Sequence, residues 1–383
     1  MHCPRSSTCR TTKSCCPTAH PDSSERRHLV AHIPFLDSTR LLHSPTALAT
    51  RLKRDGYLCL RGVLPSTDVD AVRRHVLAVA DDAGWLLPAT AAGAVPIADP
   101  TAAVWDPDPA YRQVHRRMWT HRPVHALMHH PTLLRVITAA IGTGDVFVHP
   151  RKVLRAAHPN PANPASTSLD GGWHQDFPEV QGSPNTLTVW APLAPVTPDT
   201  GALAIAPASH HEGTLPLRLA STAVGWEADV HPSLIHTGPM NPGDILIFTT
   251  HTVHRGTPNT GPGLRLSIDA RYQPVQEPIN ETCLELRDET YGWDAVYAHW
   301  PTLGDDPLVR YWQQQPLNVV PYDQRYDRWR EHTALAAGAR REPLARRALE
   351  ITAQYSQADV AARAGTLLAA LPVVKPRARA PHP

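Results

Sequence analysis

Between about residues 145 and 274 the chain is a succession of short apolar runs separated by proline, glycine, asparagine and aspartate. The runs are VFVHPRKVLRA, TLTVWAPLAPV, GALAIAPAS, DILIFTT and LRLSIDARYQP. Runs of this length with turn residues between them are typical of antiparallel strands in a sandwich or barrel, and NPGD at residues 241–244 is a clear turn before one of them. The 40 prolines among 383 residues also favour strand edges and loops over long helices. The sequence therefore predicts a mainly β fold.

Two helices are expected before these strands. In SPTALATRLKRDGYLCLRGVL, Ser44 can cap a helix that Gly56 ends, and an apolar strand at residues 57–63 follows. In PSTDVDAVRRHVLAVADDAGW, Ser66 or Thr67 is the expected cap of a helix that carries four valines on one side and ends near Gly84. The pattern predicts a helix, a strand and a second helix at the start of the folded part.

Charge and hydropathy exclude several classes of partner. The net charge is +2 with both signs interspersed, so the chain offers no basic face to a phosphate backbone, and nucleic acid is not an expected partner. No window of 18 apolar residues exists and no apolar signal core begins the chain, which predicts a cytoplasmic protein without a membrane span. Four of the six cysteines crowd a polar N-terminal stretch without Cys-x-x-Cys spacing, which favours a disordered tail over a metal or transit role.

The stretch GGWHQDFPEV places His174 and Asp176 two residues apart. On an extended segment such residues point to the same side, so both side chains could reach one point in space. Two imidazoles and one carboxylate on a single face leave three positions open, an arrangement that suits non-haem Fe(II). A second histidine must then come from a distant segment, and FTTHTVHRGTPN offers His251 and His254. Because the chain carries 23 histidines, a further signal is needed.

Arg265 supplies that signal, because it lies in the following strand, 11 residues beyond His254. An H-x-D pair, a long insert, a histidine and then an arginine is the pattern of the phytanoyl-CoA dioxygenase family of Fe(II)/2-oxoglutarate oxygenases, which this chain resembles. The segments GYLCLRGVL, WHQDF, VWAPLAPVTPDTGALAIAPASH and NPGDILIF extend the resemblance over about residues 45–275. In this pattern the arginine follows the second histidine ligand by about ten residues. The separation from Arg265 therefore favours His254 over His251 as that ligand.

The resemblance implies a fold and a set of cofactors. The fold is a double-stranded β-helix, the cupin-like jelly roll, with helices packed on one sheet. The cofactors are Fe(II), 2-oxoglutarate and O₂, with ascorbate as an activator. His174, Asp176 and His254 match the three iron ligands, which are therefore the expected catalytic residues.

Five residues are expected to bind the co-substrate. Arg265 matches the arginine that grips the far carboxylate of 2-oxoglutarate, and its planar guanidinium suits that contact. Ser267 lies on the same strand face as Arg265, and its hydroxyl could bind the same carboxylate. The alternative is that Ser267 only packs in the core. The resemblance places Trp190 in the wall of the co-substrate pocket, with Thr188 on the same strand face; a core tryptophan is the alternative. Arg151 falls where the family often has a polar residue that reaches toward the co-substrate.

The predicted reaction is hydroxylation of an unactivated carbon of a small-molecule metabolite, with decarboxylation of 2-oxoglutarate to succinate. Asp176 fills the position that halogenating relatives leave small for chloride, so halogenation is not expected. Desaturation, epoxidation or oxidative cyclisation at the same site stays open. A non-catalytic metal-binding jelly roll is disfavoured, because a structural metal site would close its coordination and have no use for Arg265.

Three parts of the chain are expected. These are a disordered tail over residues 1–28, the oxygenase jelly roll with its N-terminal helices over residues 29–280, and a C-terminal loop and helical extension over residues 281–383. Within the extension, the stretch at residues 342–371 is expected to form one or two surface helices. The extension either covers the pocket mouth or forms an oligomer contact; the oligomeric state is not predicted. The loop at residues 159–172 and the tail after residue 276 are expected to shape substrate specificity. Lys152, Arg155 and Arg271 are candidates for basic residues near the pocket mouth.

Overall fold

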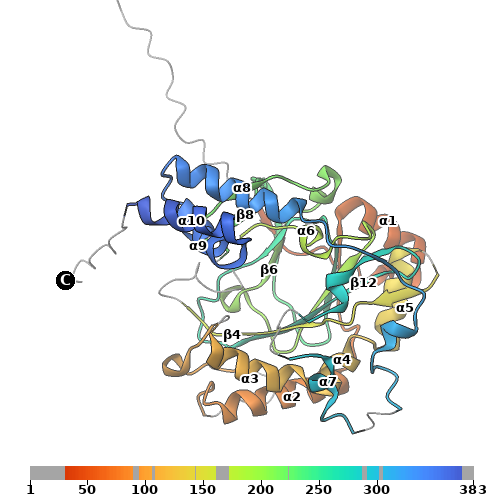
Figure 1. The fold of residues 1–383 in the computed structure, drawn as a ribbon. Coiled ribbons are helices and arrows are strands. Elements are labelled where there is room, and N and C mark those ends of the chain that lie inside the picture. Colours follow the sequence, from red (N-terminus) through yellow and green to blue (C-terminus); the bar gives the residue numbers. More distant parts are fainter. Residues whose placement is uncertain are drawn as a thin grey trace, which may run out of the picture.

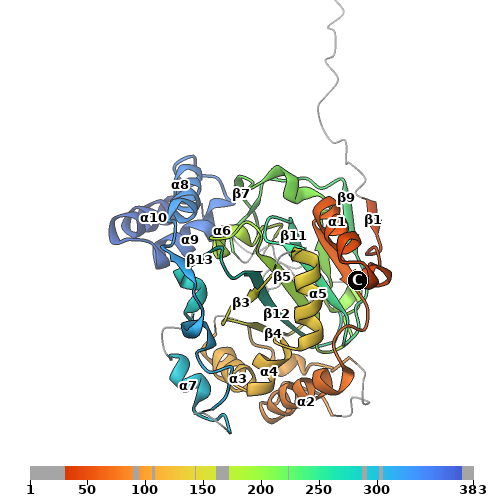
Figure 2. The ribbon, with the colours of Figure 1, turned by 90° about the vertical axis from the view of Figure 1, so that its right-hand side faces the viewer.

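The structure of the chain is a computed structural model that describes residues 31–88, 95–105, 108–142, 144–160, 172–222, 224–286, 291–301 and 305–372. The predicted tail over residues 1–28 and most of the loop at residues 159–172 lie outside the described residues. Figures 1 and 2 show a central group of strands with helices on more than one side.

The larger sheet has six strands in the order β2–β10–β5–β12–β3, with β4 also paired to β12. Its pairings are all antiparallel. The strands are β2 (Tyr57–Leu60), β3 (Val146–Val148), β4 (Val153–Ala157), β5 (Leu187–Pro192), β10 (Ile245–Thr249) and β12 (Arg265–Pro274). The five apolar runs that predicted strands thus contain strands, although the one expected at residues 57–63 ends at Leu60.

The two faces of β12 differ in chemistry, and this difference positions the site. Side chains alternate along a strand, so one face carries Leu266, Ile268, Ala270 and Tyr272, which belong to the main apolar core. The other face carries Arg265, Ser267, Asp269 and Arg271. All four of these polar side chains are buried or largely buried. Buried polar groups need partners, so this face is where a functional site is expected.

The smaller sheet packs against the larger one. Its order is β1–β9–β6–β11, and only the β1–β9 pair is parallel among its pairings. The strands are β1 (Ala31–Ile33), β6 (Leu203–Ile205), β9 (Leu234–Thr237) and β11 (His254–Gly256). A buried cluster joins Leu203 and Ile205 of this sheet to Tyr57, Trp190 and Phe248 of the larger sheet. This confirms the predicted double-stranded β-helix with flanking helices.

Five helices come before β3 in the described chain, with β2 between the first two. They are α1 (Pro45–Asp55), α2 (Ser66–Asp82), α3 (Pro109–Trp119), α4 (Arg122–Leu127) and α5 (Pro131–Ile141). Ser44 caps α1 by accepting from the Ala47 amide, and Gly56 ends it with φ +76°. The predicted cap of α2 was wrong, because Ser66 is already helical and Pro65 occupies the cap position without a side-chain hydrogen bond. The four valines of α2 are buried as predicted.

The C-terminal extension contains more helix than predicted. Besides the short α7 (Trp293–Tyr297), it forms α8 (Arg325–Ala339), α9 (Ala345–Tyr355) and α10 (Ala358–Ala370). The last three pack on one another through buried alanines and lie together on one side of the sheets in Figures 1 and 2. The one or two helices expected at residues 342–371 are α9 and α10, whereas α8 lies before that stretch and was not predicted.

Short elements complete the described chain. They are α6 (Phe177–Val180), β7 (Leu217–Leu219), β8 (Trp226–Ala228), β13 (Pro278–Asn280), β14 (Asn318–Val320) and the 3₁₀ turns η1 (Thr39–His43), η2 (Pro100–Ala102), η4 (Pro198–Thr200), η5 (Ser209–Glu212), η6 (Glu281–Leu284) and η7 (Tyr311–Gln314). In the described part, no helix has the length and apolar character needed to cross a membrane.

Candidate active site

His174 and His254 face each other across a short antiparallel bridge. The His174 amide donates to the His254 carbonyl at 2.9 Å, and the His254 amide donates to the His174 carbonyl at 3.0 Å. Residues paired in this way project side chains to the same side, and the two ring centroids are 4.2 Å apart. Segments 80 residues apart in sequence are therefore joined at the point where both imidazoles are needed.

Asp176 brings a carboxylate to the same point. It caps the short helix α6, so the second ligand candidate lies at a helix start and not on the extended segment that the H-x-D spacing predicted. Its Oδ1 lies 4.0 Å from Nε2 of His174 and 3.8 Å from Nε2 of His254. One atom from each of these three residues lies within 4.8 Å of the others, which is the arrangement in which a single metal ion could bind all three.

Backbone contacts set the tautomer of both histidines. Nδ1 of His174 lies 2.9 Å from the carbonyl oxygen of Gly172, and Nδ1 of His254 lies 2.9 Å from that of Thr252. A carbonyl oxygen only accepts hydrogen bonds, so Nδ1 of each histidine carries the proton. Nε2 of each ring is then the nitrogen with the free lone pair, and it is directed toward the side of the site on which Asp176 lies. Such contacts orient metal-binding histidines.

The second oxygen of Asp176 is already occupied. Its Oδ2 accepts a hydrogen bond from the Thr188 hydroxyl at 2.6 Å and another from Nη2 of Arg271 at 3.0 Å. Only Oδ1 remains to face the histidines. This corrects the co-substrate role predicted for Thr188, because its one hydroxyl proton is donated to Asp176 and none is left for a carboxylate of 2-oxoglutarate.

Electrostatics favour the metal-binding forms of these groups. Burial alone would raise the pKa of Asp176, but Arg271 and the two histidines hold that pKa well below its usual range. Burial and the neighbouring His174 lower the pKa of His254 to about 4. At neutral pH the site therefore offers an ionised carboxylate and a neutral imidazole, which are the forms that bind a divalent metal.

Arg265 lies next to this site as a buried cation. It is 2% exposed, and its guanidinium carbon lies 5.5 Å from the centre of the Trp190 ring. Burial and Arg155 lower its pKa to about 9, so it stays charged at neutral pH. Neither its Nε nor its Nη1 has a hydrogen-bond partner among the described residues. A buried charge without a partner is costly, so this geometry indicates an anionic ligand.

Two further buried groups await a partner near Arg265. The hydroxyl oxygen of Ser267 and Nε1 of Trp190 make no hydrogen bond within the described ranges. Both side chains are almost completely buried, and Trp190 lines the same cavity as Arg265. Hydrogen-bond donors left open beside a buried guanidinium fit the carboxylate end of 2-oxoglutarate. The residues present therefore fit the predicted co-substrate.

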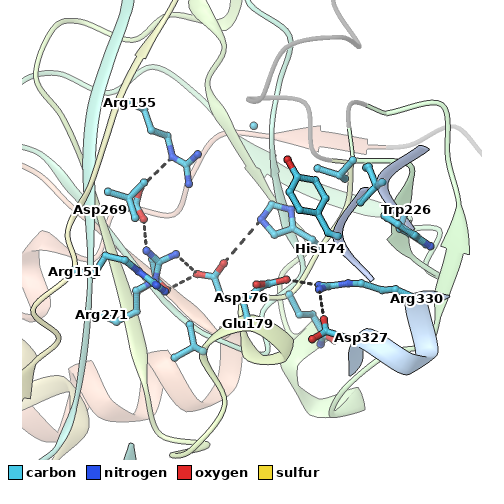
Figure 3. A pocket seen from close by; sticks show the side chains of 18 of the residues that line it. Arg151, Arg155, His174, Asp176, Glu179, Trp226, Asp269, Arg271, Asp327 and Arg330 are labelled. Atoms are coloured by element: carbon cyan, nitrogen blue, oxygen red, sulfur yellow. Dashed lines mark hydrogen bonds and ion pairs between the residues drawn. The ribbon is translucent and has the colours of Figure 1, made fainter. Parts of the chain in front are cut away.

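The remaining basic candidates are placed differently. Arg151 lines the cavity and donates from Nη1 to the Thr282 carbonyl at 3.2 Å, and Figure 3 shows it beside Arg271. Arg155 is opposite Ser267 in the pairing of β4 with β12, and its Nε donates to Asp269 at 3.1 Å. Lys152 is 2% exposed, and its Nζ donates to the His149 carbonyl at 2.7 Å. Lys152, Arg155 and Arg271 all line the cavity, and their position near its mouth stays a prediction.

His251 stays apart from the three converging groups. Its ring stacks on Phe177 with centroids 4.1 Å apart, and it does not belong to the group of possible metal ligands found in the described chain. The spacing argument that preferred His254 thus agrees with the geometry.

The site opens into a cavity of about 1240 Å³. His174, Asp176, His254 and Arg265 line it, together with residues of α3 and of the C-terminal helices α8–α10. The C-terminal extension therefore borders the pocket, as the first of its two predicted roles requires. Figure 3 shows Arg155, Asp269 and Arg271 on one side of His174 and Asp176, and Trp226 and Arg330 on the other.

Arg271 contacts a proposed metal ligand, a role that the sequence argument did not predict. It binds Asp176 and Asp269 at once, and it lies opposite Thr188 in the pairing of β12 with β5. Its position six residues after Arg265 puts it on the same strand face. That spacing was a visible signal that Arg271 belongs to the site.

Comparisons with known proteins identify relatives of this chain. The phytanoyl-CoA dioxygenase family matches residues 52–267. The 1-deoxypentalenic acid 11-beta-hydroxylase of Streptomyces arenae is 30% identical over 63% of this chain and 85% of its own length. The methylphosphonate hydroxylase of Gimesia maris is 28% identical over 36% of this chain and 51% of its own.

Solved structures are also similar to the chain. The epimerase SnoN, in complex with Fe³⁺, alpha ketoglutarate and nogalamycin RO, is 22% identical, with coverage of 61% of this chain and 85% of that chain and a TM-score of 0.42. The non-heme monooxygenase ThoJ is 17% identical, with coverage of 79% and 99% and a TM-score of 0.43. The family match spans more than half of the sequence, including every residue from His174 to Arg265. This chain belongs to the phytanoyl-CoA dioxygenase family and is an Fe(II)/2-oxoglutarate-dependent hydroxylase.

Proposed function

We propose that this enzyme hydroxylates an unactivated carbon of a small-molecule metabolite, with Fe(II) bound by Nε2 of His174, Oδ1 of Asp176 and Nε2 of His254. The observation that carries the proposal is the convergence of these three atoms beside the buried Arg265, whose Nε and Nη1 have no hydrogen-bond partner among the described residues. A structural metal site would need further protein ligands. In the described part no fourth His, Cys, Asp or Glu joins the group, so coordination positions remain for other ligands.

Arg265 is proposed to bind the far carboxylate of 2-oxoglutarate, with Ser267 and Trp190 as additional donors. Arg155 is a further candidate, because Asp269 orients its Nε while the side chain stays 36% exposed toward the cavity. A guanidinium in a dry site binds a carboxylate strongly in two-point geometry. The arrangement would orient the co-substrate so that its oxo acid end faces the iron ligands.

The protein's own part in the reaction is to bind, orient and exclude water. Iron and 2-oxoglutarate supply the oxidising chemistry, in which O₂ is consumed, 2-oxoglutarate becomes succinate and CO₂, and one oxygen atom enters the substrate. Arg271 and Thr188 fix Asp176 so that one oxygen faces the metal position. Backbone carbonyls fix both imidazoles. No side chain is needed as a general base.

The small-molecule substrate is supported by the cavity and by the relatives. A volume of about 1240 Å³ suits an organic ligand, and the Streptomyces relative is named for a hydroxylation of 1-deoxypentalenic acid. We also keep the division of the chain into an oxygenase unit over residues 29–280 and an extension over residues 281–383 as a proposal. In it, the first unit provides the chemistry and the extension takes part in substrate binding.

The test uses anaerobic protein with Fe(II). Addition of 2-oxoglutarate should produce a metal-to-ligand absorption band, and air should then give slow succinate formation without substrate. His174→Ala should lose both, whereas His251→Ala should keep the band, because His251 lies outside the ligand group. A full complement of bound iron in the wild type without any band would refute the assignment. Once a substrate is found, mass spectrometry separates hydroxylation, a gain of one oxygen, from desaturation or cyclisation, a loss of two hydrogens.

A further inference from the structure

We propose that the substrate carries a bulky apolar carbon skeleton, and that this skeleton lies against a wall built by α9, α10 and the β7–β8 hairpin. The inference rests on the proposed function, because it concerns the substrate of the same site. It names the chemical class of the part of the substrate that does not react. The wall consists of Leu217, Val224, Trp226, Ile351, Tyr355 and Val360, and is called the apolar wall below.

The apolar wall belongs to the active-site cavity, opposite the basic side of the site. All six of its residues line the cavity that also contains His174 and Asp176. In Figure 3, Trp226 lies across His174 from Arg155 and Arg271. Three of the six residues come from the C-terminal helices, which lie beyond the segment matched by the family, residues 52–267. The half of the apolar wall that α9 and α10 provide therefore belongs to the C-terminal extension and not to the segment matched by the family.

The wall is held in place by packing. Gly225 has φ +79°, and a Cβ there would lie 2.7 Å from the Ala348 amide nitrogen, so the hairpin touches the backbone of α9 directly. Trp226 packs into the same buried cluster as Ala348 and Leu349. The contact needs no ligand to form. Such a preformed surface lowers the entropic cost of binding.

An ion pair ties the extension to the metal-binding segment. Arg330 of α8 bonds to Glu179 of α6 at 2.5 Å, three residues after Asp176. The amide of Asp323 donates to the side-chain oxygen of Gln181 at 2.8 Å. The bundle is thus attached next to a proposed iron ligand, so a substrate that touches the apolar wall can also reach the metal position.

The exposed surface of the wall is apolar. Tyr355 is 66% exposed and Val224 is 43% exposed, which makes them two of the few large hydrophobic side chains with this much exposure among the described residues. Both face a cavity and not a flat surface. Exposed apolar side chains gathered in a cavity indicate an apolar ligand, because covering them removes unfavourable contact with water.

The charged groups around the wall do not favour an ionic ligand. Arg218 bonds to Glu227 at 2.6 Å, and Arg330 is shared between Glu179 and Asp327. The other charged residues that the C-terminal helices contribute to the cavity are of mixed sign; they are Arg328, Glu331 and Asp359. This side of the cavity therefore offers the apolar wall for recognition, beside charges of mixed sign and the polar residues Thr352, Ser356 and Gln357.

The volume sets the size of the skeleton. Small-molecule sites typically measure about 300–1,000 Å³, and this cavity of about 1240 Å³ exceeds that range. It can hold a substantial second molecule after the co-substrate has bound beside Arg265. The cavity therefore has room for a bulky skeleton beside the co-substrate.

The test measures binding of N-phenyl-1-naphthylamine, a neutral apolar dye that fluoresces when removed from water. Anaerobic enzyme with Fe(II) and 2-oxoglutarate should bind the dye, and 1-adamantanol should displace it, whereas methyl glucoside should not. Tyr355→Ala and Val224→Asp should each weaken dye binding by about tenfold, because they remove or charge part of the wall. Both positions are exposed, so neither change should disturb folding.

Leu344 provides matched controls on the same helical bundle. It is 50% exposed and does not line the cavity, so Leu344→Ala and Leu344→Asp should bind the dye as the wild type does. Equal dye affinity in the wall variants and the wild type, or displacement by methyl glucoside as effective as by 1-adamantanol, would overturn the inference. The absorption band with 2-oxoglutarate is read in the same samples. Its presence with unchanged dye binding means that only the apolar wall is wrong, and its absence means that the proposed function itself fails.

Discussion

Arg271 donates to Oδ2 of Asp176 at 3.0 Å, and this contact leaves only Oδ1 directed at the two histidines. The guanidinium also pairs with Asp269, so it is held from two sides. A carboxylate fixed in this way already presents one oxygen to the metal position, so little side-chain conformational entropy is lost when a metal binds. Arg271 is therefore a positioning residue for the proposed iron site.

Replacing Arg271 should weaken metal binding. In Arg271→Met, Asp176 loses its charged partner and its fixed orientation, so the dissociation constant for Fe(II) or Mn(II) should rise about 10- to 100-fold. Anaerobic calorimetry measures this. Thr188→Val should have a smaller effect, because it removes a single neutral donor.

Arg61→Met is the matched control for that experiment. Arg61 also pairs with an aspartate, Asp244, at 2.9 Å, but neither residue lines the active-site cavity. The Arg61→Met variant should therefore bind Fe(II) or Mn(II) with wild-type affinity. Wild-type affinity in Arg271→Met, with circular dichroism showing a folded protein, would contradict the positioning role.

Removing the Arg265 guanidinium should separate co-substrate binding from metal binding. Truncating one partner of a buried charge pair costs about 2–5 kcal/mol, so Arg265→Leu should raise the dissociation constant of 2-oxoglutarate by roughly 30-fold or more. Metal affinity should stay near the wild-type value, because Arg265 does not contact the ligand group. The melting temperature without 2-oxoglutarate should not fall by a comparable amount, since Nε and Nη1 of Arg265 have no hydrogen-bond partner among the described residues. A variant that binds 2-oxoglutarate normally would show that the anion lies elsewhere.

Ser267 and Trp190 should contribute less than Arg265. Each offers one neutral donor, and a neutral hydrogen bond contributes about 0.5–1.5 kcal/mol. Ser267→Ala and Trp190→Phe should therefore raise the KM for 2-oxoglutarate about 2- to 10-fold. The KM for an eventual substrate should change little. If neither variant alters the KM for 2-oxoglutarate, both side chains serve packing alone, which was the alternative reading of each.

The residues that sequence reasoning placed correctly share one property. His174, Asp176, His254 and Arg265 are recognised by their linear separations. Strand alternation predicts the face that Arg265 occupies, but not the position of Asp176, which lies at the start of α6. The structure brings the first three together and puts Arg265 in the same cavity. The apolar runs between residues 145 and 274 predicted strands for a similar reason, because alternation and turn residues are local signals.

The contacts that sequence reasoning missed depend on pairing between strands. Thr188 reaches Asp176 because it lies opposite Arg271 in the register of β5 and β12, and no local pattern gives that register. Helices α3 and α5 were also missed. Each begins with a proline that follows a capping residue, Asp108 or His130, so a helix-start signal was present in the sequence.

Lys152 should make stability depend on pH in the alkaline range. Complete burial holds its pKa well below the usual value near 10.5, so the folded protein loses this proton at a lower pH than the unfolded chain does. Between those two pKa values the unfolded chain binds more protons, and the free energy of unfolding should therefore rise with pH. The comparison is best made from pH 7.5 to 9.5, above the ordinary histidine range and below the range in which tyrosines titrate. Burial raises the pKa of Cys59 to about 12, which adds a slope of opposite sign in this window, so the slopes of the variants are compared with that of the wild type. In Lys152→Met the slope should be lower than in the wild type, whereas Lys53→Met, a change at an exposed lysine of α1, should keep the wild-type slope. Urea titrations at several pH values measure the slope, and an equal slope in wild type and Lys152→Met would mean that Lys152 remains charged in the folded protein.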